Sequence, residues 1–86
     1  MQFTGAVVRD RRFNFAVAIV RPTVLRSTVE ATKVQLAFAP VFRGMPLVLM
    51  AQDEVGTPTF HGRADLVEIL KHTNLDQVHW KVYSSS

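Results

Sequence analysis

Short apolar runs separated by polar breaks divide the chain into five predicted strands. The run 13–20, FNFAVAIV, is the most regular: its large side chains fall on one face and its alanines on the other. A face of small residues is typical of a strand against which another element packs closely. In the last strand, Val78, Trp80 and Val82 are expected to face inward. The predicted strands are residues 3–8, 13–20, 47–52, 57–61 and 77–83.

Two helices are predicted between these strands. The first begins at Ser27, because Ser27 and Glu30 have the spacing of a capping box, and it ends before Pro40. Its apolar residues fall on two opposite sides, which indicates burial between the sheet and a second surface. Residues 32–38 also alternate like a strand, but the cap and the length favour a helix. The second helix, residues 63–73, carries its leucines and isoleucine at helical spacing on one face.

A hairpin is predicted between the third and fourth strands. Residues 53–56, DEVG, supply the loop, with the glycine where a positive φ angle is needed. A pairing of Gln52 with Thr57 would place His61 opposite Val48. The proline of the fourth strand cannot donate to a ladder, so this strand is expected at an edge of the sheet or with that position facing outward.

Together these elements predict a single α+β domain over residues 1–83, followed by a frayed tail at residues 84–86. The element order is ββαββαβ, with a mainly antiparallel five-stranded sheet and two helices. A chain of 86 residues suits one domain, and a domain of this size has a thin margin of stability.

The composition predicts self-association. Hydrophobic residues make up 48% of the chain and charged residues 20%, which is apolar for a small monomer. Strand 47–52 is apolar on both faces, and with only two helices one sheet face is left for a partner chain. We therefore expect a homodimer, with Ala16, Ala18, Val48 and Met50 as candidate interface residues.

The formal net charge of +3 is divided unevenly along the chain. Residues 1–43 carry seven Lys or Arg and two Asp or Glu, a net charge of +5, and residues 44–86 carry three and five, a net charge of −2. Arg9, Arg11 and Arg12 are candidate anion-binding residues, with phosphate contacts to nucleic acid as one alternative. The neighbouring phenylalanines share a face with valine and isoleucine, so they are assigned to the core rather than to base stacking. Arginines that keep strand edges soluble are the preferred interpretation.

Histidines are the clearest candidates for chemistry. His61 and His79 would share one sheet face, with Arg63 and Tyr83 nearby, if their strands were neighbours, and this polar site could hold an anion or transfer a proton. The histidines lack metal-ligand spacing and no cysteine is present, so no metal or cofactor is expected. No nucleophile elbow or glycine-rich phosphate loop occurs. Structural histidines are the preferred interpretation, and an enzyme is the less favoured class.

The same composition bears on location. The lack of cysteine suits a reducing cytoplasm. No apolar run reaches the roughly 18–20 residues that a membrane span needs. The first twelve residues place their basic side chains after the apolar stretch, which is the reverse of a secretion signal. We expect a cytoplasmic protein without a membrane partner.

The segment PVFRGMPLVLMAQDEVGTPTFHGRADLVEIL, together with HWKVY near the end, resembles short uncharacterised bacterial proteins. The chain is also similar in kind to products of mobile integron gene cassettes, in its size and isolation. This resemblance implies a compact, often dimeric α+β domain, and it implies no activity and no functional residues.

Three functions follow from these observations, in order of preference. The first is a small non-catalytic domain that self-associates or binds a partner. The second is a domain whose basic face binds nucleic acid or another anion. The third is a small-ligand or enzyme site around His61 and His79.

Overall fold

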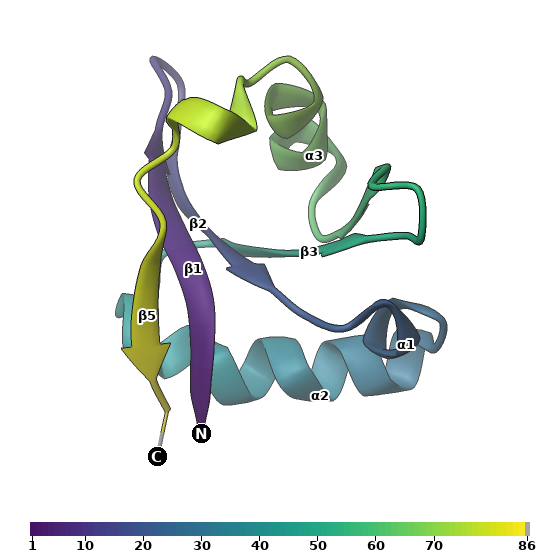
Figure 1. Cartoon of the computed structure of the whole chain (residues 1–86). Helices are drawn as coiled ribbons and strands as arrows, with labels where there is room; N and C mark the ends of the chain where they lie inside the picture. The colour runs from purple at the N-terminus through teal and green to yellow at the C-terminus, as the bar shows by residue number, and fades with distance from the viewer. Residues whose placement is uncertain (86) are drawn as a thin grey trace.

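A computed structural model describes residues 1–85, and Ser86 lies outside the described part of the chain. Ten elements follow one another (Figure 1): β1 (Gln2–Arg9), β2 (Asn14–Ile19), α1 (Pro22–Leu25), α2 (Thr28–Phe38), η1 (Ala39–Phe42), β3 (Leu47–Gln52), β4 (Pro58–His61), α3 (Ala64–Lys71), η2 (Leu75–Gln77) and β5 (Lys81–Ser84). The predicted α+β class and five-stranded sheet are confirmed. The described chain has three α-helices where two were predicted, because α1 forms an extra turn that begins at a proline, a residue favoured at the first helical position.

The five strands form one mixed sheet in the order β4-β3-β2-β1-β5. Three neighbouring pairs are antiparallel, as predicted, but β2 and β3 are parallel. The chain between β2 and β3 crosses over through α2 instead of returning through a hairpin, and such a crossover connects parallel strands. The sheet is therefore less uniformly antiparallel than the sequence suggests.

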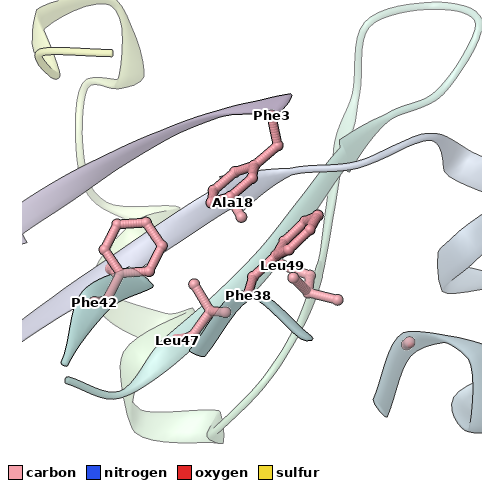
Figure 2. Close-up of a cluster of buried hydrophobic side chains, with 8 residues drawn as sticks. Phe3, Ala18, Phe38, Phe42, Leu47 and Leu49 are labelled. Atoms are coloured by element: carbon pink, nitrogen blue, oxygen red, sulfur yellow. The ribbon is translucent and has the colours of Figure 1, made fainter. Parts of the chain in front are cut away.

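Helices cover both faces of this sheet (Figure 1). The α2-side cluster comprises Phe3, Ala16, Ala18, Ala31, Phe38, Phe42, Leu47 and Leu49. The α3-side cluster comprises Val8, Phe15, Val17, Val48, Met50, Leu66, Ile69 and Leu70. Figure 2 shows the α2-side cluster, and the side chains that it labels come from β1, β2, α2, η1 and β3. The alternation of large and small residues in β2 is explained, because its alanines let α2 approach closely on one face.

The candidate interface residues are buried within the single chain. Ala16, Ala18 and Val48 have no exposed area, and Met50 is 3% exposed. The two alanines lie in the α2-side cluster, and Val48 and Met50 lie in the α3-side cluster. The expectation of an open sheet face is thereby corrected. Two helices suffice to cover this small sheet, because each one packs on a different face, so these four residues offer no surface to a second chain.

Helix α2 forms where the capping box predicts it. The Ser27 hydroxyl accepts a hydrogen bond from the backbone N–H of Glu30 at 3.3 Å, and the helix ends at Phe38. Its apolar residues fall on two sides as expected, but no second surface of the described chain covers the outer side, where Val29 is 65% and Leu36 is 69% exposed. We call these two residues the α2 outer face. No helix within residues 1–85 has both the length and the apolar character that crossing a membrane requires.

The register of the β3–β4 hairpin differs from the predicted one by one residue. Gln52 pairs with Pro58, so His61 lies opposite Leu49 instead of Val48. The reason is the side chain of Asp53, whose Oδ1 accepts the backbone N–H groups of Val55 at 3.0 Å and Thr57 at 2.8 Å. This carboxylate holds a longer loop than the sequence pattern suggests. The loop glycine has φ +84° and β4 lies at a sheet edge, and both features were predicted.

The C-terminal segment departs most from expectation. β5 begins at Lys81, because residues 75–77 form η2 and the indole Nε1–H of Trp80 donates to the carbonyl of Leu75 at 3.0 Å. The strand extends to Ser84, and Ser85 also exchanges backbone hydrogen bonds with the first residue, so a frayed tail is wrong for these two residues. The remainder of the predicted tail, residue 86, lies outside the described residues.

Candidate self-association edge

The four residues of the predicted polar site are not brought together. β4 and β5 are the two outermost strands. His61 is the last residue of β4 and His79 lies two residues before β5, so the two histidines belong to segments at opposite sides of the sheet. Four inter-strand steps of about 4.8 Å separate these edges by roughly 19 Å. Arg63 donates to Asp65 Oδ2 at 2.7 Å. Tyr83 belongs to the aromatic group at β5, so this geometry supports no shared chemistry with the histidines.

The three candidate anion-binding arginines lie at the turn between β1 and β2. Arg9 and Arg11 are exposed, and Arg12 donates from its backbone N–H and its Nε to Asp10 Oδ2 at 3.2 and 3.4 Å. Arg12 and Asp10 also line a depression of about 330 Å³ with two carboxylates of α3. The turn therefore combines both signs of charge and does not form a purely basic face.

Two carboxyl groups near this turn have lowered pKa values. The backbone N–H of Arg12 lowers the pKa of Asp10 below its ordinary value of 3.8, and the side chain of Arg63 does the same for Asp65. A carboxylate whose pKa is depressed by folding stabilises the folded chain above its unfolded pKa. That contribution is lost as the pH falls from about 3.8 through the folded value.

We expect NMR titration of the side-chain carboxyl carbons to give midpoints below 3.8 for both residues. Arg63→Gln should return the midpoint of Asp65 toward 3.8, because it removes the largest cause of the shift. Arg12→Gln should restore the midpoint of Asp10 only in part, because the backbone N–H remains. A midpoint of 3.8 or higher in the unmodified protein would contradict these contacts.

The outer side of β5, residues 81–84, has no strand partner in the described chain, and we call it the β5 edge. β5 is the last strand of the sheet and pairs with β1. The backbone N–H of Ser85 donates to the carbonyl of Met1 at 2.8 Å, and the Met1 amino group donates back to the Ser85 carbonyl at 3.1 Å. These bonds fix which backbone groups of the strand point toward β1.

Hydrogen-bonded and non-hydrogen-bonded pairs alternate along an antiparallel ladder. Because Ser85 is hydrogen-bonded to β1, so is Tyr83, which lies opposite Phe3. Val82 and Ser84 therefore turn their N–H and C=O groups away from β1 and toward solvent. Each of these two residues presents at the β5 edge one donor and one acceptor that have no partner among residues 1–85.

The opposite edge of the sheet, formed by β4, has fewer outward hydrogen-bond donors. The backbone N–H of Asp53 donates to the carbonyl of Thr57 at 3.0 Å, which by the same alternation turns Pro58 and Phe60 outward. Proline has no N–H, so β4 offers a single outward donor where β5 offers two. Of the two edges, β5 is the better template for pairing with another strand.

An aromatic stack ends at the β5 edge. The ring of Phe3 lies 4.0 Å from Phe38 and 5.7 Å from Tyr83, both in stacked orientation, and Phe42 lies 4.9 Å from Tyr83. Tyr83 is only partly buried, and its neighbour Val82 is 67% exposed. The sequence pattern predicts the reverse, with Val82 inside. Val78 and Trp80 pack against the α3-side cluster, and Val82 lies on the same side of the sheet, because Tyr83 pairs with Phe3 on the α2 side. The prediction fails at Val82 because the α3-side cluster does not extend over this end of β5.

Comparison with known proteins identified no relative. No family model, no curated protein and no solved structure matches the chain. The resemblance to short bacterial proteins of integron cassettes therefore stays a prediction. The geometry of the β5 edge is the stronger guide to function.

Proposed function

We propose that this chain is a small binding domain that forms a homodimer through its β5 edge. The observation that carries the proposal is the β5 edge, which no strand of the described chain covers. Val82 and Ser84 each direct an N–H and a C=O group outward there, and the side chain of Val82 is exposed. Dimerisation would place the edge strands of two copies antiparallel, so that their sheets become continuous across a two-fold axis.

The alternation of β5 selects one register for this dimer. A two-fold axis at Tyr83 lets Val82 of each copy exchange both backbone hydrogen bonds with Ser84 of the other, which gives four bonds in all. The two Tyr83 rings would then be neighbours and extend the aromatic stack. Lys81 would lie opposite Ser85 of the second copy and away from the other Lys81, so this register avoids repulsion between like charges.

Removing the outward donor tests the proposal without disturbing the sheet. The N–H of Val82 points away from β1, so Val82→Pro should keep the monomer folded while it deletes one hydrogen bond in each half of the dimer. Two bonds of about 0.5–1.5 kcal/mol each correspond to a loss of affinity on the order of tenfold or more. Val82→Lys should weaken the dimer as well, by exposing a charge at the edge.

The measurement is sedimentation velocity over a concentration series, with thermal unfolding to confirm that each variant is folded. Val29→Lys is the matched control, because it adds the same charge at a valine of similar exposure, 65% against 67%, on the α2 outer face. We expect a dimer for the unmodified protein and for Val29→Lys, and a monomer for the two Val82 variants. A monomer at all concentrations, or a dimer lost only with Val29→Lys, would overturn the proposal.

A further inference from the structure

A crevice lies where the two parallel strands end. β2 ends at Ile19 and β3 ends at Gln52, so their carboxyl ends meet at one side of the sheet. From β2 the chain continues to α2 on one face, whereas from β3 it continues through β4 to α3 on the other (Figure 1). Neighbouring parallel strands whose connections diverge in this way leave a crevice outside their ends, where ligands of open α/β sheets bind.

This crevice has a volume of about 660 Å³ and lies between α1 and the β3–β4 loop. Its lining carries cations on one side and anions on the other, with two apolar side chains: Arg21, Arg26, Asp53, Glu54, Pro22 and Val55. The volume falls within the range of small-molecule sites. Four other hollows of the described chain have smaller volumes, from about 310 to 440 Å³, and the site described above does not include this crevice.

The charges across the crevice do not neutralise one another within the described chain. Within residues 1–85 neither Arg21 nor Arg26 lies within 4.0 Å of a carboxylate, so no salt bridge joins them to the facing loop. Oδ1 of Asp53 is engaged by the loop backbone, whereas no hydrogen bond or ion pair among residues 1–85 involves Glu54. The crevice therefore presents two guanidinium groups and the Glu54 carboxylate to any molecule that enters it.

We propose that this crevice binds a small zwitterion, a molecule with a carboxylate at one end, a protonated amine at the other and methylene groups between them. The arginines suit the carboxylate, because a guanidinium group donates two parallel hydrogen bonds to it. The amine suits Glu54, and the methylene groups suit Pro22 and Val55. A simple dianion would meet the loop carboxylates, and a simple cation would meet the arginines. This inference does not depend on dimerisation, because the crevice and the β5 edge share no residue.

The test is an NMR titration of the ¹⁵N-labelled chain with glycine, 4-aminobutyrate and 6-aminohexanoate, which separate the two charges by increasing lengths. Hexanoate and hexylamine serve as probes with a single charge. We expect saturable shifts confined to residues 21–26 and 53–56, with at least one zwitterion binding about tenfold more tightly than either single-charge probe. Loss of one charge-assisted contact corresponds to a change of that order.

Two variants assign the charges. Arg26→Gln and Glu54→Gln should each weaken the best zwitterion about tenfold, because each removes one charged end of the site. Arg11→Gln is the matched control, since it removes an exposed arginine at the distant β1–β2 turn, and it should leave the titration unchanged. Equal binding of hexanoate would overturn the proposal in favour of a simple anion site. Shifts that do not saturate with any of the zwitterions would overturn it altogether.

Discussion

Replacing Phe3 with alanine should lower the free energy of unfolding by about 3–5 kcal/mol. Phe3 is 7% exposed and belongs to the α2-side cluster. Its ring contacts three other aromatic rings, with centroids at 4.0 Å for Phe38, 5.7 Å for Tyr83 and 6.0 Å for Phe42. Because this ring lies among three others, its truncation loses buried apolar area and leaves a cavity, and both contribute to the cost.

This loss is large for so small a domain. At about 0.05–0.15 kcal/mol per residue, a chain of this length has a total stability of roughly 4–13 kcal/mol. Urea unfolding followed by circular dichroism measures the change. Phe3→Leu is the control, because it keeps most of the volume and should cost less than about 1.5 kcal/mol. A cost below about 1 kcal/mol for Phe3→Ala would contradict a central role for this ring.

The sequence predicts those parts of the fold that depend on neighbouring residues. The alternation of residues 13–20 assigns both faces of β2 correctly, because side chains in a strand alternate whatever lies beside it. Ser27 and Glu30 locate the start of α2 for a similar reason, since the cap is a contact over three positions. In α3, Leu66, Ile69 and Leu70 are the residues buried on its inner face.

The order of the strands depends on contacts that these local patterns do not contain. The sequence pattern does not distinguish whether strands 57–61 and 77–83 are neighbours or opposite edges of the sheet. The predicted site of His61 and His79 requires them to be neighbours. The actual order follows from the parallel crossover between β2 and β3, which places β4 outside β3 and leaves β5 to pair with β1. The predicted histidine site is wrong because of this strand order, and not because the residue types are unsuited to such a site.

The sequence also does not show which surfaces of the fold stay exposed, and the reasons are physical. A strand that is apolar on both faces, such as β3, indicates two covering layers, but it does not say whether the second layer comes from the same chain. The opposite net charges of the two halves of the sequence face each other in the fold. Arg21 and Arg26 of the basic half lie across a crevice from Asp53 and Glu54 of the acidic half. These charged residues lie far apart in the sequence, and the parallel pairing of β2 with β3 brings them close together in space.

Gly5 explains how closely the strands and the aromatic rings approach one another in the middle of β1. A Cβ atom at this position would lie 2.8 Å from the carbonyl oxygen of Val17, 3.3 Å from a ring carbon of Phe3 and 3.4 Å from a ring carbon of Phe42. The first of these distances is below normal contact, and its partner is backbone of the neighbouring strand. A glycine within a strand pattern is a sequence signal for such a close approach.

We therefore expect Gly5→Ala to cost about 1–3 kcal/mol, the range for inserting a carbon atom into a packed core. Thermal and urea unfolding measure this cost. Gly44→Ala separates contact from backbone strain, because Gly44 has φ +83° and nothing within 4 Å of an added Cβ. Its cost should be roughly 1–2 kcal/mol and should arise from backbone conformation alone.

The double variant Gly5→Ala with Phe42→Leu identifies which contact dominates. If the cost of Gly5→Ala comes from the carbonyl of Val17, a smaller side chain at position 42 relieves little of it, and the two costs should add to within about 0.5 kcal/mol. Marked rescue by Phe42→Leu would instead place the conflict with the ring. A neutral Gly5→Ala would show that β1 and β2 can separate, and the aromatic stack would then be too loose to hold Tyr83 in position at the β5 edge.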